Sequence, residues 1–156
     1  MARGADMTDE DYMREALALA RRGYELGEVP IGAVIVYDGQ IVAASHNLKE
    51  ARRDPTAHAE MVAISAATQA LGRWRLTGCM MYVTIEPCAM CAGALVLARI
   101  DRLVYGAADP KAGAVGSIMD IARHERLNHR VEVTGGVLAE ECGALVSTFF
   151  QARRGG

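Results

Sequence analysis

The sequence predicts a three-layer α/β/α fold, in which a central five-stranded mixed sheet lies between helices. Two observations carry this prediction. After an initial hairpin, short apolar runs rich in β-branched residues alternate with segments whose apolar residues have helical spacing. The chain of 156 residues also contains no repeat, low-complexity tract or interdomain linker, so residues 1–156 are expected to form a single domain.

The first part of the chain is expected to contain one helix followed by a β-hairpin. Thr8-Asp9-Glu10-Asp11 is typical of a helix start, and small or apolar residues continue the helical pattern until Gly27. Residues 29–37 and 40–45 are apolar runs, and Asp38-Gly39 between them is a strong signal for a two-residue hairpin turn. These runs are therefore predicted to be the first two strands.

The following elements alternate between helix and strand. Residues 46–56 are polar and are expected to form a loop, in which Asp54 or Thr56 could cap a helix that continues to about Leu71. Residues 80–85 are predicted to form the third strand.

The second half of the chain continues this alternation. A buried helix is predicted over residues 87–99, opened by a proline whose missing N–H would be unpaired in the first turn anyway. Strands are predicted at residues 102–106 and at residues 131–133 with Val137. The spacing of apolar residues predicts a terminal helix over residues 138–154.

Composition excludes several classes of protein. With 51% hydrophobic and 23% charged residues, the chain has the composition of a globular domain. No apolar run approaches the length of a membrane span, and the first six residues lack the apolar core of a signal peptide, so a cytoplasmic protein is expected. The formal net charge of −2 neither supports nor excludes an RNA partner.

Two short motifs about thirty residues apart predict a catalytic metal site: His58-Ala59-Glu60 and Pro87-Cys88-Ala89-Met90-Cys91. His58, Cys88 and Cys91 offer one imidazole and two thiolates, which leaves the fourth tetrahedral position of a Zn²⁺ ion for water. Glu60 is not needed as a ligand and can move protons for that water. The sequence therefore predicts a zinc hydrolase.

Helix geometry indicates how these residues meet. Positions i and i+2 of a helix point about 200° apart, so His58 and Glu60 can reach one point only beyond the N-terminal end of their helix. Cys88 and Cys91 share one face of the first turn of the next helix. Two helix N-termini are therefore expected to converge on the metal, where the helix dipole favours thiolate.

Other interpretations of the cysteines and histidines are weaker. The four cysteines could form two disulfides, but C-x-x-C together with a distant H-x-E favours a metal in a reducing compartment. Cys79 and Cys142 lie in apolar patterns and are interpreted as core thiols. A structural zinc would need a fourth ligand and would leave Glu60 without a role; the remaining histidines are His46, His124 and His129.

The H-A-E and P-C-x-x-C motifs resemble the signature of the cytidine-deaminase-like zinc deaminases. The resemblance is closer to the bacterial tRNA-specific adenosine deaminases and extends from about Asp11 to Phe150. The segments that carry it are residues 28–34, 54–60, 86–94, 105–114 and 128–131. The loop over residues 109–116, followed by Asn128-His129, is more similar to the tRNA enzymes than to other deaminases.

The resemblance implies hydrolytic deamination of the wobble adenosine to inosine in the anticodon loop of tRNA, with an arginine tRNA carrying the anticodon ACG as the expected substrate. It implies one Zn²⁺ per subunit, bound by His58, Cys88 and Cys91, with a water or hydroxide as the fourth ligand. Glu60 would be the catalytic proton carrier. The family also implies a homodimer that binds the tRNA anticodon stem-loop, without a membrane partner.

The same resemblance implies a set of substrate contacts. Asn47 matches a residue that hydrogen-bonds the flipped base, although from composition alone an ordinary polar turn residue is equally expected at this position. Residues 109–111 match a loop that touches flanking nucleotides, although alone they read as an ordinary turn. Spacing favours core positions for Phe149 and Phe150 over stacking on RNA. The expected substrate contacts are Asn47, Val29, Pro30, Ala59, Asp109, Lys111 and Phe149.

Two other functions stay open at this point. A small-molecule deaminase acting on guanine, cytosine or a nucleoside would share the zinc site but would not need the 109–111 loop or the basic terminal helix. A zinc-folded binding module without catalysis would not need Glu60. The short tail after Arg154 and the slightly acidic net charge are both expected to weaken contacts with phosphates.

Overall fold

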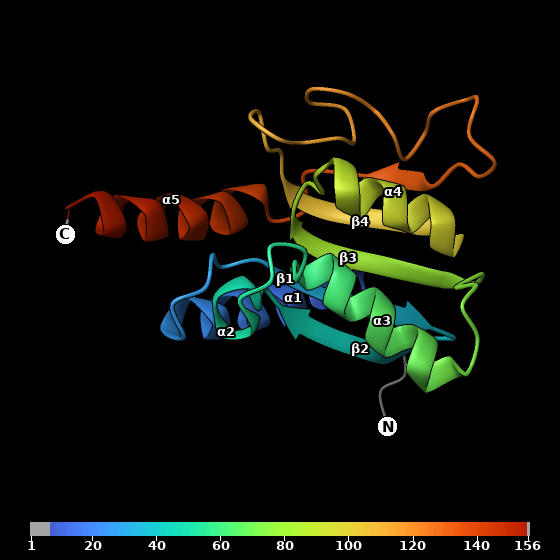
Figure 1. Cartoon of the computed structure of the whole chain (residues 1–156), viewed down its shortest axis with the longest axis horizontal. Helices are drawn as coiled ribbons and strands as arrows, with labels where there is room; N and C mark the ends of the chain where they lie inside the picture. Colours follow the sequence, from blue (N-terminus) through green and yellow to red (C-terminus); the bar gives the residue numbers. More distant parts are fainter. Residues whose placement is uncertain (1–6, 156) are drawn as a thin grey trace.

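A five-stranded sheet forms the centre of the molecule (Figure 1), in a computed structural model that describes residues 7–155. The strand order is β2-β1-β3-β4-β5. β1 pairs in antiparallel fashion with both β2 and β3, whereas β3, β4 and β5 run parallel. The strands are β1 (Gly32–Tyr37), β2 (Gln40–His46), β3 (Cys79–Ile85), β4 (Arg102–Ala107) and β5 (Glu132–Thr134). The prediction of a mixed five-stranded sheet is confirmed.

Helices cover both faces of this sheet. The helices are α1 (Asp9–Glu25), α2 (Lys49–Arg52), α3 (Ala59–Leu71), α4 (Ala89–Ala98) and α5 (Ala139–Gly155). α3 and α4 pack on one face, in front of the sheet in Figure 1, and α1 and α5 pack on the other. β1 alternates between the two cores, because Ala33 and Ile35 face α3 and α4 while Val34 and Val36 face α1. The three-layer architecture is therefore confirmed.

Local signals account for the first helix and the hairpin. Thr8 and Asp11 form a capping box, in which the Asp11 amide donates to Thr8 Oγ1 at 3.1 Å and the Thr8 amide to Asp11 Oδ2 at 2.9 Å. Asp38 and Gly39 both have positive φ, at 51° and 73°, as a primed two-residue turn requires. Both predictions from sequence are confirmed.

The segment after β2 differs from the predicted loop. It contains the short helix α2, whose amides at Glu50 and Ala51 donate to the buried carboxylate of Glu28 at 3.0 and 2.8 Å. The expectation that Asp54 or Thr56 caps α3 was wrong: the N-cap is His58, and Asp54 instead accepts a hydrogen bond from the Thr56 amide at 2.8 Å.

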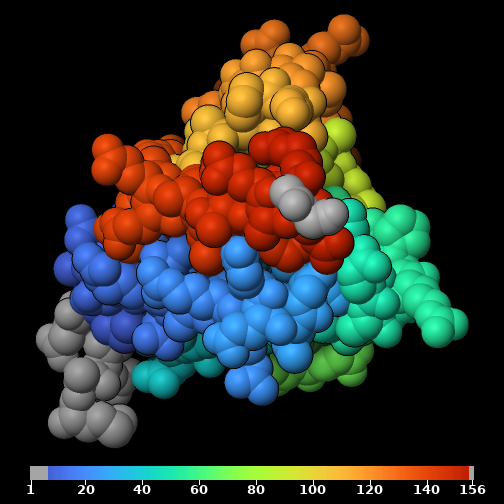
Figure 2. Space-filling view, turned by 90° about the vertical axis from the view of Figure 1, so that its left-hand side faces the viewer, coloured from blue at the N-terminus to red at the C-terminus, as the bar shows by residue number. Residues whose placement is uncertain are grey.

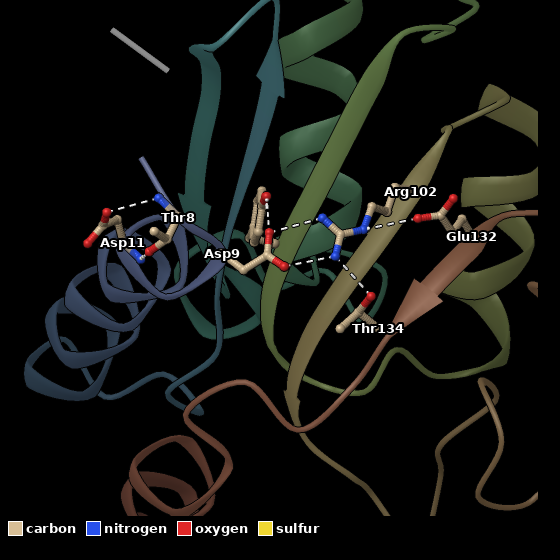
Figure 3. A network of polar contacts seen from close by, with 7 residues as sticks. Thr8, Asp9, Asp11, Arg102, Glu132 and Thr134 are labelled. Atoms are coloured by element: carbon tan, nitrogen blue, oxygen red, sulfur yellow. Dashed lines mark hydrogen bonds and ion pairs between the residues drawn. The ribbon is translucent and has the colours of Figure 1, made fainter. Parts of the chain in front are cut away.

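An ion-pair network fastens α1 to the far edge of the sheet (Figure 3). The Arg102 guanidinium binds Asp9 in bidentate fashion, at 3.0 and 2.8 Å, and also donates to Thr134 at 2.9 Å. Tyr82 donates to Asp9 at 2.8 Å, and Glu132 lies 3.4 Å from Arg102 Nε. The network thus ties the start of α1 to β3, β4 and β5.

Figure 2, in which the C-terminal end of α5 points toward the viewer, shows α5 (red) next to α1 (blue). None of the helices within residues 7–155 combines the length and apolar character needed to cross a membrane. The six N-terminal residues, on which the signal-peptide expectation rests, lie outside the described range.

Candidate metal centre and adjoining cavity

His58, Cys88 and Cys91 form a cluster that can hold a metal ion. His58 is the N-cap residue of α3, Cys88 is the N-cap of α4 and Cys91 is the third residue of α4. His58 Nδ1 lies 3.6 Å from Cys88 Sγ and 3.5 Å from Cys91 Sγ. Tetrahedral Zn²⁺ with ordinary bond lengths holds a nitrogen and a sulfur ligand about 3.5 Å apart. Two helix N-termini therefore converge with spacings that fit a metal, as their sequence positions predicted.

No fourth side-chain ligand joins this cluster within the described part of the chain. The three other histidines have partners elsewhere. His46 Nδ1 lies 2.8 Å from the Asn47 carbonyl, His124 Nδ1 accepts from the Arg126 amide at 3.1 Å, and His129 Nε2 lies 2.6 Å from the Ile100 carbonyl. A three-ligand set leaves a coordination position for a reactant, which distinguishes catalytic from structural zinc sites.

Hydrogen bonds within the cluster favour the thiolate form of Cys88. Hydrogen bonds from Cys91 and His58 lower the pKa of Cys88 to about 3, whereas the hydrogen bond to Cys88 and burial raise the pKa of Cys91. Cys79 and Cys142 are buried apart from the cluster, and burial raises the pKa of both, that of Cys142 to about 11. These two are core thiols, as their apolar surroundings in the sequence indicated.

Glu60 lies in the first turn of α3 with 3% of its surface exposed. Burial raises the pKa of its carboxyl group to about 7, and Oε1 has no hydrogen-bond partner in the described protein. A buried acid that titrates near neutrality can take up and release protons at physiological pH. An unpartnered buried oxygen beside a three-ligand metal cluster also fits a water molecule that a bound metal would hold there.

A cavity of about 680 Å³ opens next to His58, a size that suits a nucleoside. Its lining combines the loop before β1, the start of α2, the end of β4 with the following loop, and α5. Five of the residues predicted from sequence face it: Val29, Asn47, His58, Asp109 and Lys111. Other lining residues include Ile31, Lys49, Ile85, Val146, Ser147, Phe150, Gln151 and Arg154.

Asn47 is held in one orientation at this cavity. It is 4% exposed, and its Oδ1 accepts a hydrogen bond of 3.0 Å from the Ala59 amide, the first N–H of α3. With the oxygen engaged, the Asn47 Nδ2 group is the part of the side chain left to donate to a ligand.

Three of the expected substrate contacts do not line the cavity. Pro30 and Ala59 are buried and do not belong to its lining. Phe149 is 5% exposed and packs edge-to-face with Tyr24 at 5.4 Å, with the Arg153 guanidinium 4.5 Å from its ring centroid. Phe150, which is 41% exposed, faces the cavity instead. Adjacent residues on a helix point about 100° apart. The spacing of apolar residues alone could therefore not decide which of the two phenylalanines on α5 faces the cavity.

The buried carboxylate of Glu86 was not identified from the sequence as a feature of the site, nor was Lys49 identified as one of the basic residues of the cavity. Lys49, Lys111 and Arg154 all face the cavity, and none of them forms an ion pair within residues 7–155. Burial alone would raise the pKa of Glu86, but hydrogen bonds from Ser117 and from three backbone amides hold it below its usual value. The only signal for Glu86 in the sequence was the presence of an acidic residue directly after an apolar strand.

Known proteins resemble the chain over nearly its whole length. Residues 7–154 match the family model of the MafB19-like deaminases. The tRNA-specific adenosine deaminase of Bacillus subtilis is 53% identical over 94% of this chain and 91% of its own. A structure from work on A-to-I editing by tRNA A34 deaminases at the wobble position superposes with a TM-score of 0.83, at 46% identity over 86% of this chain and 97% of the other. The guanine deaminase of Bacillus subtilis has a TM-score of 0.65 at 34% identity, with 96% of each chain covered.

Proposed function

The chain belongs to the MafB19-like deaminase family and is related to the tRNA-specific adenosine deaminases, and from this premise we propose that it converts the wobble adenosine of a tRNA anticodon loop to inosine. The observation that carries the proposal is the cavity beside the metal cluster, which is lined by three cations that have no ion pair within residues 7–155. A polyanion such as RNA supplies the phosphates that such groups bind. The expected substrate is an arginine tRNA with the anticodon ACG.

The metal is proposed to be zinc, one ion per subunit, bound by His58 Nδ1 and by the sulfurs of Cys88 and Cys91. When bound, it would supply a Lewis acid and a water molecule of lowered pKa. Glu60 supplies the proton transfers: its carboxylate takes one proton from the attacking water and passes it to the ring nitrogen of adenine, then takes the second proton from the newly added hydroxyl group and passes it to the departing amino group, which leaves as ammonia. Adenosine and water thereby give inosine and ammonia.

The cavity residues are proposed to orient the base. Asn47 Nδ2 donates a hydrogen bond to the flipped base, and Val29 packs against its face, with Pro30 supporting this wall from behind. Ala59 contributes through its amide, which fixes Asn47. Asp109 and Lys111 contact the nucleotides that flank the target. Phe150, in place of Phe149, contacts the substrate by stacking on a base.

A small-molecule deaminase is the second candidate, since a guanine deaminase shares the fold at 34% identity. The higher identity to the tRNA enzymes and the basic lining favour RNA. We also propose that residues 1–156 act as one domain in a cytoplasmic homodimer. α4 carries no charged residue, and Leu97 on it is 71% exposed, which suits a subunit interface.

The test presents zinc-loaded protein with an arginine tRNA of anticodon ACG and, separately, with free adenosine, cytidine and guanine. We expect inosine at the wobble position and no turnover of the free compounds. Turnover of a free compound with an untouched tRNA would move the protein to the small-molecule class.

A further inference from the structure

The carboxylate of Glu86 is hydrogen-bonded to the loop that follows β4. Glu86 directly follows the last residue of β3 and is two residues before Cys88. It is 3% exposed and does not line the cavity. A charged group so deeply buried requires hydrogen-bond partners. All the groups that donate to the Glu86 carboxylate belong to one segment of the chain.

That segment, residues 109–117, closes around the carboxylate and is here called the Glu86 loop. Glu86 Oε1 accepts hydrogen bonds from the Asp109 amide at 3.0 Å and from the Ser117 hydroxyl. Oε2 accepts from the amides of Val115 at 2.9 Å and Ser117 at 3.1 Å. A Cβ atom at Gly113 would overlap the carboxylate, so the loop approaches as closely as glycine allows.

The Glu86 loop also carries a wall of the cavity. Asp109 and Lys111 both face the cavity, and Asp109 Oδ1 accepts from the amides of Lys111 and Ala112 at 3.0 and 3.2 Å. The Asp109 amide is itself anchored on Glu86. On the other side, the Pro87 carbonyl accepts from the Ala114 amide at 2.9 Å, which binds the loop to the residue before Cys88.

We propose that Glu86 is a positioning residue, which sets the substrate-binding wall formed by Asp109 and Lys111 in register with the metal ligands. It acts through the loop backbone and touches neither metal nor substrate. The expected effect of Glu86 on turnover rests on the proposed RNA substrate. Its expected effect on the order of the loop does not. Control of substrate binding is thereby assigned to Glu86, and the chemical step is left to Glu60.

Glu86→Gln tests the proposal, because an amide presents an NH₂ group to donors that need an acceptor. Hydrogen–deuterium exchange without substrate should quicken about tenfold at the amides of Asp109, Val115 and Ser117, with exchange in α3 unchanged. With the tRNA substrate, KM should rise about tenfold while kcat stays within about threefold, at unchanged metal content.

Three variants serve as comparisons. Ser117→Ala removes fewer of the bonds and should give a smaller change of the same kind, even if Glu86→Gln folds poorly. Glu86→Asp keeps the charge and should restore part of the loss in KM. Glu10→Gln breaks an exposed pair with Arg14 on α1, at 3.7 Å, which has no contact with the Glu86 loop, and should change neither exchange nor KM.

Unchanged exchange in the Glu86 loop, or a fall in kcat at constant KM, would overturn the proposal. Loss of metal from Glu86→Gln would also overturn it. Failure of the wild-type protein to deaminate tRNA would refute the proposed function alone, because the exchange measurement would still decide whether Glu86 orders the loop.

Discussion

Phe149 and Phe150 are adjacent residues on α5 with opposite surroundings. Phe149 is 5% exposed against Tyr24, and Phe150 is 41% exposed at the cavity. Phe149→Ala should lower the free energy of unfolding by about 3 kcal/mol, as truncation of a buried aromatic does. Phe150→Ala should change stability by less than about 1 kcal/mol and weaken RNA binding about tenfold through loss of base stacking. Urea denaturation and fluorescence anisotropy with an RNA stem-loop measure the two effects, and the reverse pattern would refute the assignment.

The Asn47 side chain accepts a hydrogen bond from the Ala59 amide through Oδ1, which leaves its Nδ2 group to donate to a ligand. Asn47→Asp keeps an acceptor for the Ala59 amide, 3.0 Å away in the wild-type protein, but replaces the Nδ2 donor with a second acceptor. This variant should keep a wild-type melting temperature and lose at least about tenfold in kcat/KM. Asn47→Ala should lose both activity and about 1 kcal/mol of stability. Full activity in Asn47→Asp would show that the base does not use this donor.

At the scale of elements, the Asp9–Arg102 pair makes the docking of α1 dependent on pH (Figure 3). Hydrogen bonds from Arg102 and then Tyr82 hold the pKa of Asp9 below its ordinary 3.8. Since the pKa is lower in the folded state, the stabilisation is complete above pH 3.8 and is lost as pH falls through the lowered pKa.

Asp9→Asn should therefore cost about 1 kcal/mol at pH 7, a modest amount because the Asp9 side chain is still 34% exposed. The difference from wild type should shrink as the pH falls below 3.8. Urea unfolding at pH 7 and pH 3 measures it. Glu10→Gln, in the same turn but with only an exposed partner at 3.7 Å, is the matched control and should have little effect. A difference that is constant with pH would contradict the ion-pair explanation.

The elements differ in how well the sequence predicts them. α1 and the β1–β2 hairpin are specified by contacts within a few residues, a capping box and a primed turn, so local patterns predicted them well. α2 was missed because its amides are capped by Glu28, which lies more than twenty residues earlier in the chain. The start of α3 was misplaced because His58, an uncommon N-cap residue, occupies that position.

At the scale of the whole molecule, the metal cluster was predictable and the cavity was not. His58, Cys88 and Cys91 belong to two compact motifs whose spacing reflects metal chemistry. The cavity is built from segments spread along the chain from Val29 to Arg154, and only the folded chain brings them together. The Glu86 loop likewise has no pattern of its own, because its order comes from a carboxylate on another element.

A charged substitution at Leu97, the exposed leucine of α4, tests the proposed homodimer. Leu97 is 71% exposed on a helix without charged residues, so Leu97→Glu should bury a charge in the interface and shift the protein to monomers. Leu26, which is 61% exposed after α1, provides the matched control, and Leu26→Glu should leave the oligomer unchanged. Sedimentation velocity measures both. A wild-type monomer, or a dimer unaffected by Leu97→Glu, would contradict this interface.

The proposed reaction requires that His58, Cys88 and Cys91 hold a metal while Glu60 moves protons for deamination. The most direct test measures bound zinc and inosine formation in Glu60→Gln beside the wild-type protein. We predict one zinc ion per subunit in both proteins and a loss of inosine formation of at least about 100-fold in the variant, because Gln cannot carry the proton. Inosine formation by Glu60→Gln at the wild-type rate would contradict the claim.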